Sequence, residues 1–456
     1  MTAGRTPNTA LRALLTEAAW TGPELARAVD RAGADSGLAL HYDRTSVAHW
    51  LTGSRPPEHV AELVAECLSR ALGRQVTVSQ TALTRHVHQP STAESTPQPA
   101  EDLMAPLAKL AGGNSGTSAA ARTLAYSLTL PLPSFTTPPP LPPPSHHPQS
   151  PRSPQSPGPS TAQAAELLLP LFADSDSQHG GGRSRAALAT YLTTVITPAL
   201  RTRTTPREHQ RLLVQASRLT YLAGYMCFDE HLGGGAQIYY RTSAHLAAQA
   251  GDLSGYTTAL RAMSIQAHHL GHHTHALDLA QAAAHHIPHL PTGQAPQLTA
   301  QLALATAAQG DHRQARTHLH HAEQLAEQSD SSCGTIGSYH LAALAHQRAE
   351  ILSAAGDRQG AINALTLSLR HRPDDERRAR ALTTARLAEL HLEQGHLEQA
   401  CTTWHAFLDD LPHLHSARAT TALTTLRARL RPYRGVSAAK TVLERSRVRS
   451  MAKPTP

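Results

Sequence analysis

A short predicted helix carries polar side chains of the types and spacing that contacts with nucleic acid require. The segment begins with Asp43, a good N-cap residue, and reaches a stop signal at Gly53. A buried stripe is predicted by the i, i+3, i+4 spacing of Val47, Trp50 and Leu51. Arginine and short hydroxyl side chains can contact bases or phosphates in the major groove of DNA. The candidate DNA-binding residues lie opposite the stripe or just after the helix: Arg44, Thr45, Ser46, His49 and Arg55.

A second helix is predicted immediately before this one, over the segment TGPELARAVDRAG. Proline is tolerated in the first turn of a helix, which suits Pro23. One apolar side is formed by Leu25, Ala28 and Val29. About eleven residues, 32–42, would join the two helices.

The two segments ELARAV and TSVAHWLTGSRPP resemble the helix-turn-helix of the Cro/repressor-like (XRE) family over roughly residues 8–75. The resemblance implies that the second helix enters the major groove. The sequence departs from the family pattern in its longer turn, so the standard docking geometry does not follow from the resemblance. Residues 1–90 carry nine arginines and eight acidic residues, so their net charge of +1 gives little general attraction to phosphates. A small helical domain without DNA binding is the alternative.

The C-terminal half contains a repeated spacing of glycine and alanine. The glycine permits a tight turn after one helix, and the small alanine lets the next helix pack closely against it. In three of four cases a proline, which ends the second helix, follows 17 residues after the glycine. The pattern predicts helical hairpins of the tetratricopeptide (TPR) type, stacked into an α-solenoid with a concave groove. The pairs are Gly271 and Ala276, Gly310 and Ala315, Gly356 and Ala361, and Gly395 and Ala400.

Changes in composition divide the chain into four parts and predict an all-α fold. Residues 1–83 are expected to form the helix-turn-helix-like domain, and residues 161–430 the TPR-like domain. Residues 84–160 are expected to be a largely disordered linker, because thirteen prolines stand between positions 131 and 159. Residues 431–456 form a basic tail, which is either a solvated end or a source of phosphate contacts.

The 31 histidines call for a comparison with metal sites. They gather at 268–275, 285–289 and 318–321, but the first group straddles the turn predicted at Gly271 and no HExxH pattern occurs. Structural or surface histidines are therefore favoured, and neither a metal nor a cofactor is expected. The run His-Gly-Gly-Gly at 179–182 lacks the Lys-Ser/Thr of a phosphate loop, so it predicts a loop between helices. No nucleophile constellation is recognisable, and enzyme activity is not expected.

The four cysteines are widely separated and form no CxxC pair, which argues against a disulfide framework or a zinc finger. The first residues lack the apolar core of a signal peptide, and no run of 18 apolar residues occurs. A cytoplasmic location without a membrane partner is expected.

The whole layout resembles a family of actinobacterial regulators that join such an N-terminal domain to TPR repeats. The segments YDRTSVAHWLTGSRPP, HGGGRSRAALATYL and LAGYMCFDEHLGGGAQIYYRTSAHLAAQAGD carry the resemblance by their order and spacing. It implies a DNA-binding transcriptional regulator whose repeats bind a protein, peptide or small-molecule signal in their groove. A homodimer would be natural, because one small helix reads only a half-site. The competing hypothesis is a TPR interaction scaffold whose N-terminal domain does not bind DNA.

Overall fold

The structure is a computed structural model of the 456-residue chain. It describes residues 6–35, 38–84, 100–111, 124–128, 134–135, 160–328 and 340–448. These ranges consist of helices, turns and loops and contain no strand, which confirms the predicted all-α fold class. Among the described helices, none combines the length and the apolar character that a membrane crossing requires.

The N-terminal domain packs its helices around one apolar cluster that includes Val47, Trp50 and Leu68. Helix α2 continues two residues past the predicted end at Gly33, so the connection to α3 is shorter than the sequence pattern suggested. The backbone N–H of Tyr42 donates to the Asp30 carboxylate at 2.9 Å, which fixes this connection against α2. The elements of the domain are α1 (Thr9–Glu17), α2 (Gly22–Asp35), α3 (Arg44–Leu51), α4 (Glu58–Leu72) and the short 3-10 turn η1 (Ser79–Thr81).

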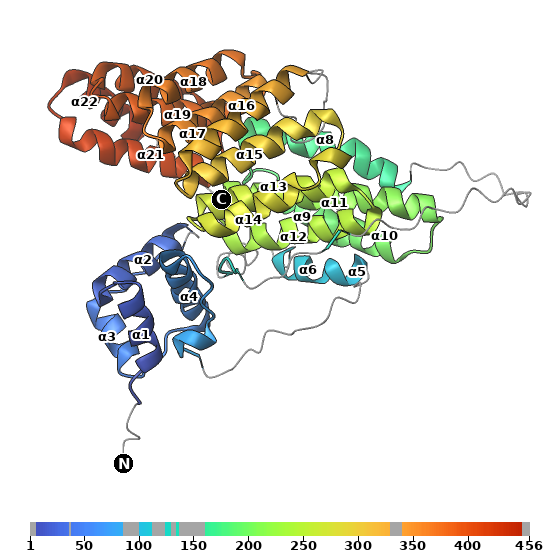
Figure 1. Ribbon diagram of the computed structural model, residues 1–456, viewed down its shortest axis with the longest axis horizontal. Helices are drawn as coiled ribbons and strands as arrows, with labels where there is room; N and C mark the ends of the chain where they lie inside the picture. Colours follow the sequence, from blue (N-terminus) through green and yellow to red (C-terminus); the bar gives the residue numbers. More distant parts are fainter. Residues whose placement is uncertain are drawn as a thin grey trace, which may run out of the picture.

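The second half is an α-solenoid in which consecutive helices pair as antiparallel hairpins (Figure 1). The four repeat glycines all lie in the turns within hairpins, with φ between +83° and +88°, where a side chain would be strained. The alanines five residues later are fully buried against the partner helices. The hairpins are α11 (Pro206–Asp229) with α12 (Gly233–Ala250), α13 (Leu253–His269) with α14 (His273–Ala284), α15 (Ala295–Ala308) with α16 (His312–Gln328), α17 (Leu341–Ala354) with α18 (Arg358–His371), and α19 (Arg377–Glu393) with α20 (Leu397–Asp410).

Parts of the expected linker belong to the packed structure. Helix α6 (Ala105–Ala111) and Met104, which joins it to α5 (Ala100–Leu103), contribute fully buried Leu107 and Met104 to the core of the solenoid. Their apolar side chains cover α12 and the segment formed by α9 (Arg185–Tyr191), the π-helical stretch Leu192–Ile196 and α10 (Thr197–Arg201). Most of the proline-rich stretch, which was expected to be a spacer, lies outside the described residues.

The basic C-terminal stretch, residues 431–456, contains a packed helix. Beyond α21 (Ala417–Leu430), helix α22 (Ser437–Val448) packs on α20. Ala439 and Val442 are fully buried there, because the sequence from 437 has small and apolar residues at helical spacing among its basic ones. Residues 437–448 therefore extend the solenoid, in contrast to a solvated end; residues 449–456 lie outside the described part.

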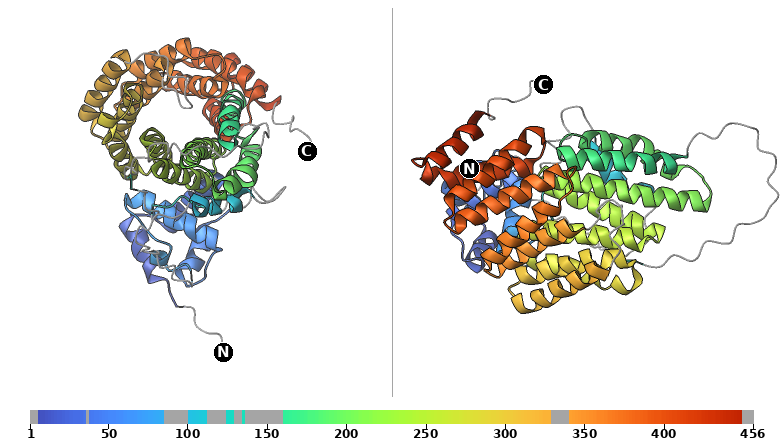
Figure 2. Two further views of the ribbon diagram at one scale, coloured as in Figure 1. Left: turned by 90° about the vertical axis from the view of Figure 1, so that its right-hand side faces the viewer. Right: turned by 90° about the horizontal axis from the view of Figure 1, so that it is seen from above.

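The solenoid curves until its two ends meet. The left view of Figure 2 shows the hairpins arranged as a ring, with α8 (Thr161–His179) beside the C-terminal hairpins. Contacts between α8 and α19 close this ring. We call the joint the seam and define it by residues 176–182 and 225–231 on one side and residues 378 and 413–421 on the other.

Candidate nucleic-acid interface

The polar face predicted from the sequence exists on α3. Asp43 caps the helix by accepting a hydrogen bond from the backbone N–H of Ser46 at 2.8 Å. Val47 is fully buried and Trp50 is only 4% exposed, so the opposite face must point to solvent. Figure 1 places α3 on the side of the N-terminal domain away from the solenoid, whereas α4 faces the solenoid. The side chains of Arg44, Thr45, His49 and Arg55 are exposed, and that of Ser46 is half-buried.

The five candidate residues differ in how free their polar groups are. The hydroxyl and the backbone N–H of Ser46 both donate to the Asp43 carboxylate at 2.8 Å. These bonds, first of all the backbone one from Ser46, hold the pKa of Asp43 below its ordinary value. Within the described residues, no ion pair engages Arg44 or Arg55. Among the candidate contact groups, the hydroxyl of Ser46 is therefore already hydrogen-bonded, whereas the side chains of Arg44, Thr45, His49 and Arg55 are exposed.

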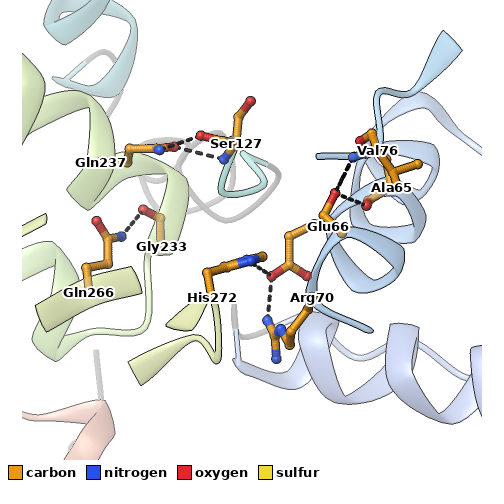
Figure 3. Close-up of polar contacts among 10 residues, drawn as sticks. Ala65, Glu66, Arg70, Val76, Ser127, Gly233, Gln237, Gln266 and His272 are labelled. Carbon is orange, nitrogen blue, oxygen red and sulfur yellow. Dashed lines mark hydrogen bonds and ion pairs between the residues drawn. The ribbon is translucent and has the colours of Figure 1, made fainter. Parts of the chain in front are cut away.

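Behind this face, a buried polar cluster joins the N-terminal domain to the solenoid (Figure 3). His272, in the turn between α13 and α14, places Nε2 3.0 Å from Oε1 of Glu66 on α4, and Arg70 pairs with the same oxygen. The side chains of Glu66 and His272 are only 5% and 2% exposed. Burial alone would raise the pKa of Glu66, but the hydrogen bond from His272 and the charge of Arg70 outweigh it and lower the pKa. We call Glu66, Arg70 and His272 the junction.

A cleft of about 210 Å³ opens beside the junction. One side is formed by α4 and the residues that follow it, the other by the α13–α14 turn, and Leu128 also lines it. Gly271 lies against Arg70: a Cβ at this glycine would stand 3.2 Å from Cδ of Arg70. The close approach of the two domains thus uses a glycine that the repeat pattern already requires for its turn.

The short segment Leu124–Leu128, which we call the strap, packs against α12 and the junction. Backbone N–H of Ser127 donates to Oε1 of Gln237 at 2.9 Å, and Nε2 of Gln237 donates back to the Ser127 carbonyl at 2.6 Å (Figure 3). The ring of Tyr126 stacks on His272 with 5.1 Å between centroids. The strap lies so close to α12 that a Cβ on Gly234 would stand 2.4 Å from the Leu124 carbonyl oxygen.

We expect Gly234→Ala to displace the strap. The methyl group would meet backbone atoms, which cannot rotate away, so the paired hydrogen bonds between Ser127 and Gln237 should break. Amide hydrogen exchange at Ser127 should accelerate by about tenfold or more, as expected for the loss of a partly buried pair of hydrogen bonds. Gly233→Ala is the matched control, because its Cβ would have only Leu270 nearby, at 4.0 Å. Equal exchange rates in the two variants would contradict this account of the strap.

The junction was not predicted from the sequence. Glu66 lies within the run of buried residues 63–69 on α4, and an acidic residue on such a face signals a buried partner. His272 is part of the histidine cluster that was attributed to structural or surface roles. The structure places it in the buried contact, while the neighbouring His273 is exposed. In the described part of the chain, no three His, Cys, Asp or Glu side chains come together as metal ligands would.

The comparisons with known proteins concern the same N-terminal domain. Residues 11–87 match a family model described as SP15 N-terminal domain. The matched range contains α2, α3 and α4 and ends beyond η1, so the face of α3 and the α4 side of the junction both lie in it. No curated protein matches the chain.

Proposed function

We propose that the protein is a DNA-binding transcriptional regulator that reads DNA with the exposed face of α3. The observation that carries this proposal is the orientation of α3, which lies on the side of the N-terminal domain away from the solenoid (Figure 1). Val47 and Trp50 on its apolar side are buried and Leu51 is half-buried, whereas Arg44 and His49 on the helix, and Arg55 just after it, are exposed. A helix with this placement can approach a major groove without a clash from the rest of the chain. The resemblance of the segment to the XRE helix-turn-helix supports the same function. Such a function would place the protein in the cytoplasm with the DNA.

The solenoid is the proposed sensing half. TPR-like hairpins bind peptides, proteins or small ligands along the face formed by their first helices. A signal bound there could reach the DNA-reading domain through the junction, because His272 belongs to the α13–α14 hairpin and Glu66 to the same domain as α3. Because α3 has only eight residues, we expect a homodimer that reads two half-sites.

The second candidate is a TPR-like scaffold whose N-terminal domain does not bind DNA. The near-neutral charge of residues 1–90 and the hydrogen-bonded hydroxyl of Ser46 favour it, since both reduce the contacts available to phosphates.

Selection of DNA sequences separates the two candidates. The full chain would be incubated at low salt with a pool of random-sequence duplexes, and the bound fraction would be amplified and sequenced. A regulator should enrich one short motif, in paired half-sites if it is a dimer. An unenriched pool after repeated rounds would reject the proposal and leave the scaffold as the remaining candidate.

A further inference from the structure

The seam of the ring has a different chemistry from its other joints. Arg378 on α19 is buried, and its Nη1 donates to Oδ1 of Asp176 on α8 at 2.6 Å. Its Nε stands 3.9 Å from Oδ1 of Asp229 at the end of α11, and its guanidinium lies over the ring of Tyr225, 4.7 Å from the centroid. Asp229 also accepts from the Ser416 hydroxyl at 2.9 Å. Three helices from the two ends of the solenoid thus meet at buried charges.

The run of three glycines at 180–182 closes the seam along the backbone. The N–H of His415 donates to the His179 carbonyl at 2.6 Å, and the N–H of Gly182 donates to the His415 carbonyl at 3.0 Å. A Cβ on Gly180 would stand 2.6 Å from the His415 carbonyl oxygen, and one on Gly181 would stand 2.6 Å from the Met226 carbonyl oxygen. Glycine at 181 lets the loop approach α11 on its own side of the seam, whereas glycine at 180 lets it approach the 413–421 segment across the seam, as the closed ring requires.

Apart from the seam, each joint between neighbouring hairpins contains buried apolar side chains from both hairpins. Four buried clusters of the solenoid pass from one hairpin to the next: one extends from α11 to Leu298 of α15, one from α15 to α17, one from α17 to α19, and one from α19 to α22. Among the described residues, no buried apolar cluster contains side chains from both sides of the seam. The aromatic side chains at the seam, Tyr225 and Phe228, contact the guanidinium groups of Arg378 and Arg418.

This difference decides which joint opens most easily. Burial of apolar surface contributes about 25 cal/mol per Å² to the stability of a joint. A buried ion pair contributes little net stability, because the desolvation of its charges offsets their attraction. Polar interfaces within a chain also behave more like transient contacts than like domain cores. The seam should therefore separate before any joint between hairpins.

We propose that the ring opens at the seam and that this opening gates access of a signal to the face that the ring encloses. The gating role rests on the sensing function proposed above for the solenoid; the opening itself does not. The hairpins stay folded in the open state, while α8 and the 180–182 loop leave α19 and the 413–421 segment. Closure restores the Arg378 contacts with Asp176 and Asp229.

The test is hydrogen exchange and small-angle scattering on the full chain without DNA or ligand. Arg378→Met keeps the length of the side chain but leaves Asp176 and Asp229 buried without their cation. Exchange of the amides whose hydrogen bonds cross the seam, at Gly182, His415 and Ala417, should accelerate by about tenfold or more, and the radius of gyration should increase. Arg380→Met is the matched control: Arg380 is on the same helix and pairs with Asp410 at 2.6 Å, but this pair does not cross the seam.

Unchanged seam exchange in Arg378→Met would overturn the proposal, and so would acceleration spread evenly over all hairpins or shared by Arg380→Met.

A second variant, in which the ring is covalently held closed, tests the proposal even if Arg378→Met fails to fold. His231 and Thr421 are joined across the seam at 3.0 Å, so His231→Cys with Thr421→Cys can be bridged by a short dithiol-reactive linker. The bridge should slow exchange at the seam amides at least about fivefold relative to the unbridged protein. No slowing would show that the ring opens elsewhere and overturn the proposal. Neither measurement involves DNA, so their results are independent of DNA selection.

Discussion

Trp50→Ala should lower the free energy of unfolding of the N-terminal domain by about 3–5 kcal/mol, the usual cost of deleting a buried aromatic side chain. Trp50 is 4% exposed and lies in the middle of the apolar cluster of this domain. Its ring meets Tyr42 edge-on with 5.1 Å between centroids, so the substitution also removes the support of the connection between α2 and α3. A domain of this size has little stability to lose. The exposed face of α3 should disappear with the fold of the domain.

Differential scanning calorimetry of the full chain measures this effect. The transition of the N-terminal domain should move to a much lower temperature, and the transition of the solenoid should shift little. Trp20→Ala is the matched control, since Trp20 is only partly buried against the same cluster and should cost much less. A Trp20 variant as unstable as the Trp50 variant would show that α3 is not packed as described.

His272→Ala should separate the N-terminal domain from the solenoid. The substitution removes the hydrogen bond to Glu66 and the stacking partner of Tyr126, and it leaves the buried Glu66 carboxylate with Arg70 alone. The loss of a partner to a buried acceptor costs about 1–3 kcal/mol, which is roughly a tenfold to hundredfold change in the docking equilibrium. Distances between spin labels on α2 and α16 should report a second, broader population.

His273→Ala is the control for this effect, because the neighbouring side chain is exposed and takes no part in the junction. Its distance distribution should match that of the unaltered chain. A single, unchanged distance in the His272 variant would contradict the role of the junction in holding the two domains together.

Short-range signals made the helices predictable. Asp43 with Ser46, and each repeat glycine with the alanine five residues later, act within one or two helical turns, so their spacing is visible in the sequence. The same local reasoning located the exposed face of α3 from the positions of Val47 and Trp50. It misjudged the last part of the chain, where the many arginines concealed the apolar spacing of α22.

Contacts between segments far apart in the chain have no such local spacing in the sequence that could predict them. Glu66 and His272 are 206 residues apart, and Arg378 and Asp176 are 202 residues apart. Whether Arg378 meets Asp176 depends on the curvature of the whole solenoid, which accumulates small rotations over its hairpins. Whether Glu66 meets His272 depends on how the N-terminal domain docks on the α13–α14 hairpin, and neither arrangement has a local sequence pattern. The three glycines at 180–182 were visible, but the two backbones they accommodate were not. The junction and the seam therefore came from the structure alone.

Binding of the full chain to its selected duplex, measured over a salt series, tests the central claim most directly. Arg44→Ala should weaken binding by about 1–3 kcal/mol if Arg44 reads a base, or reduce the salt slope by about one if it contacts a phosphate. Arg74→Ala is the control, because Arg74 follows α4 and pairs with Glu17 away from α3. The account predicts a loss of affinity for Arg44→Ala and near-normal affinity for Arg74→Ala, with both proteins folded. Equal affinities of the two variants, or no binding even at low salt, would contradict it.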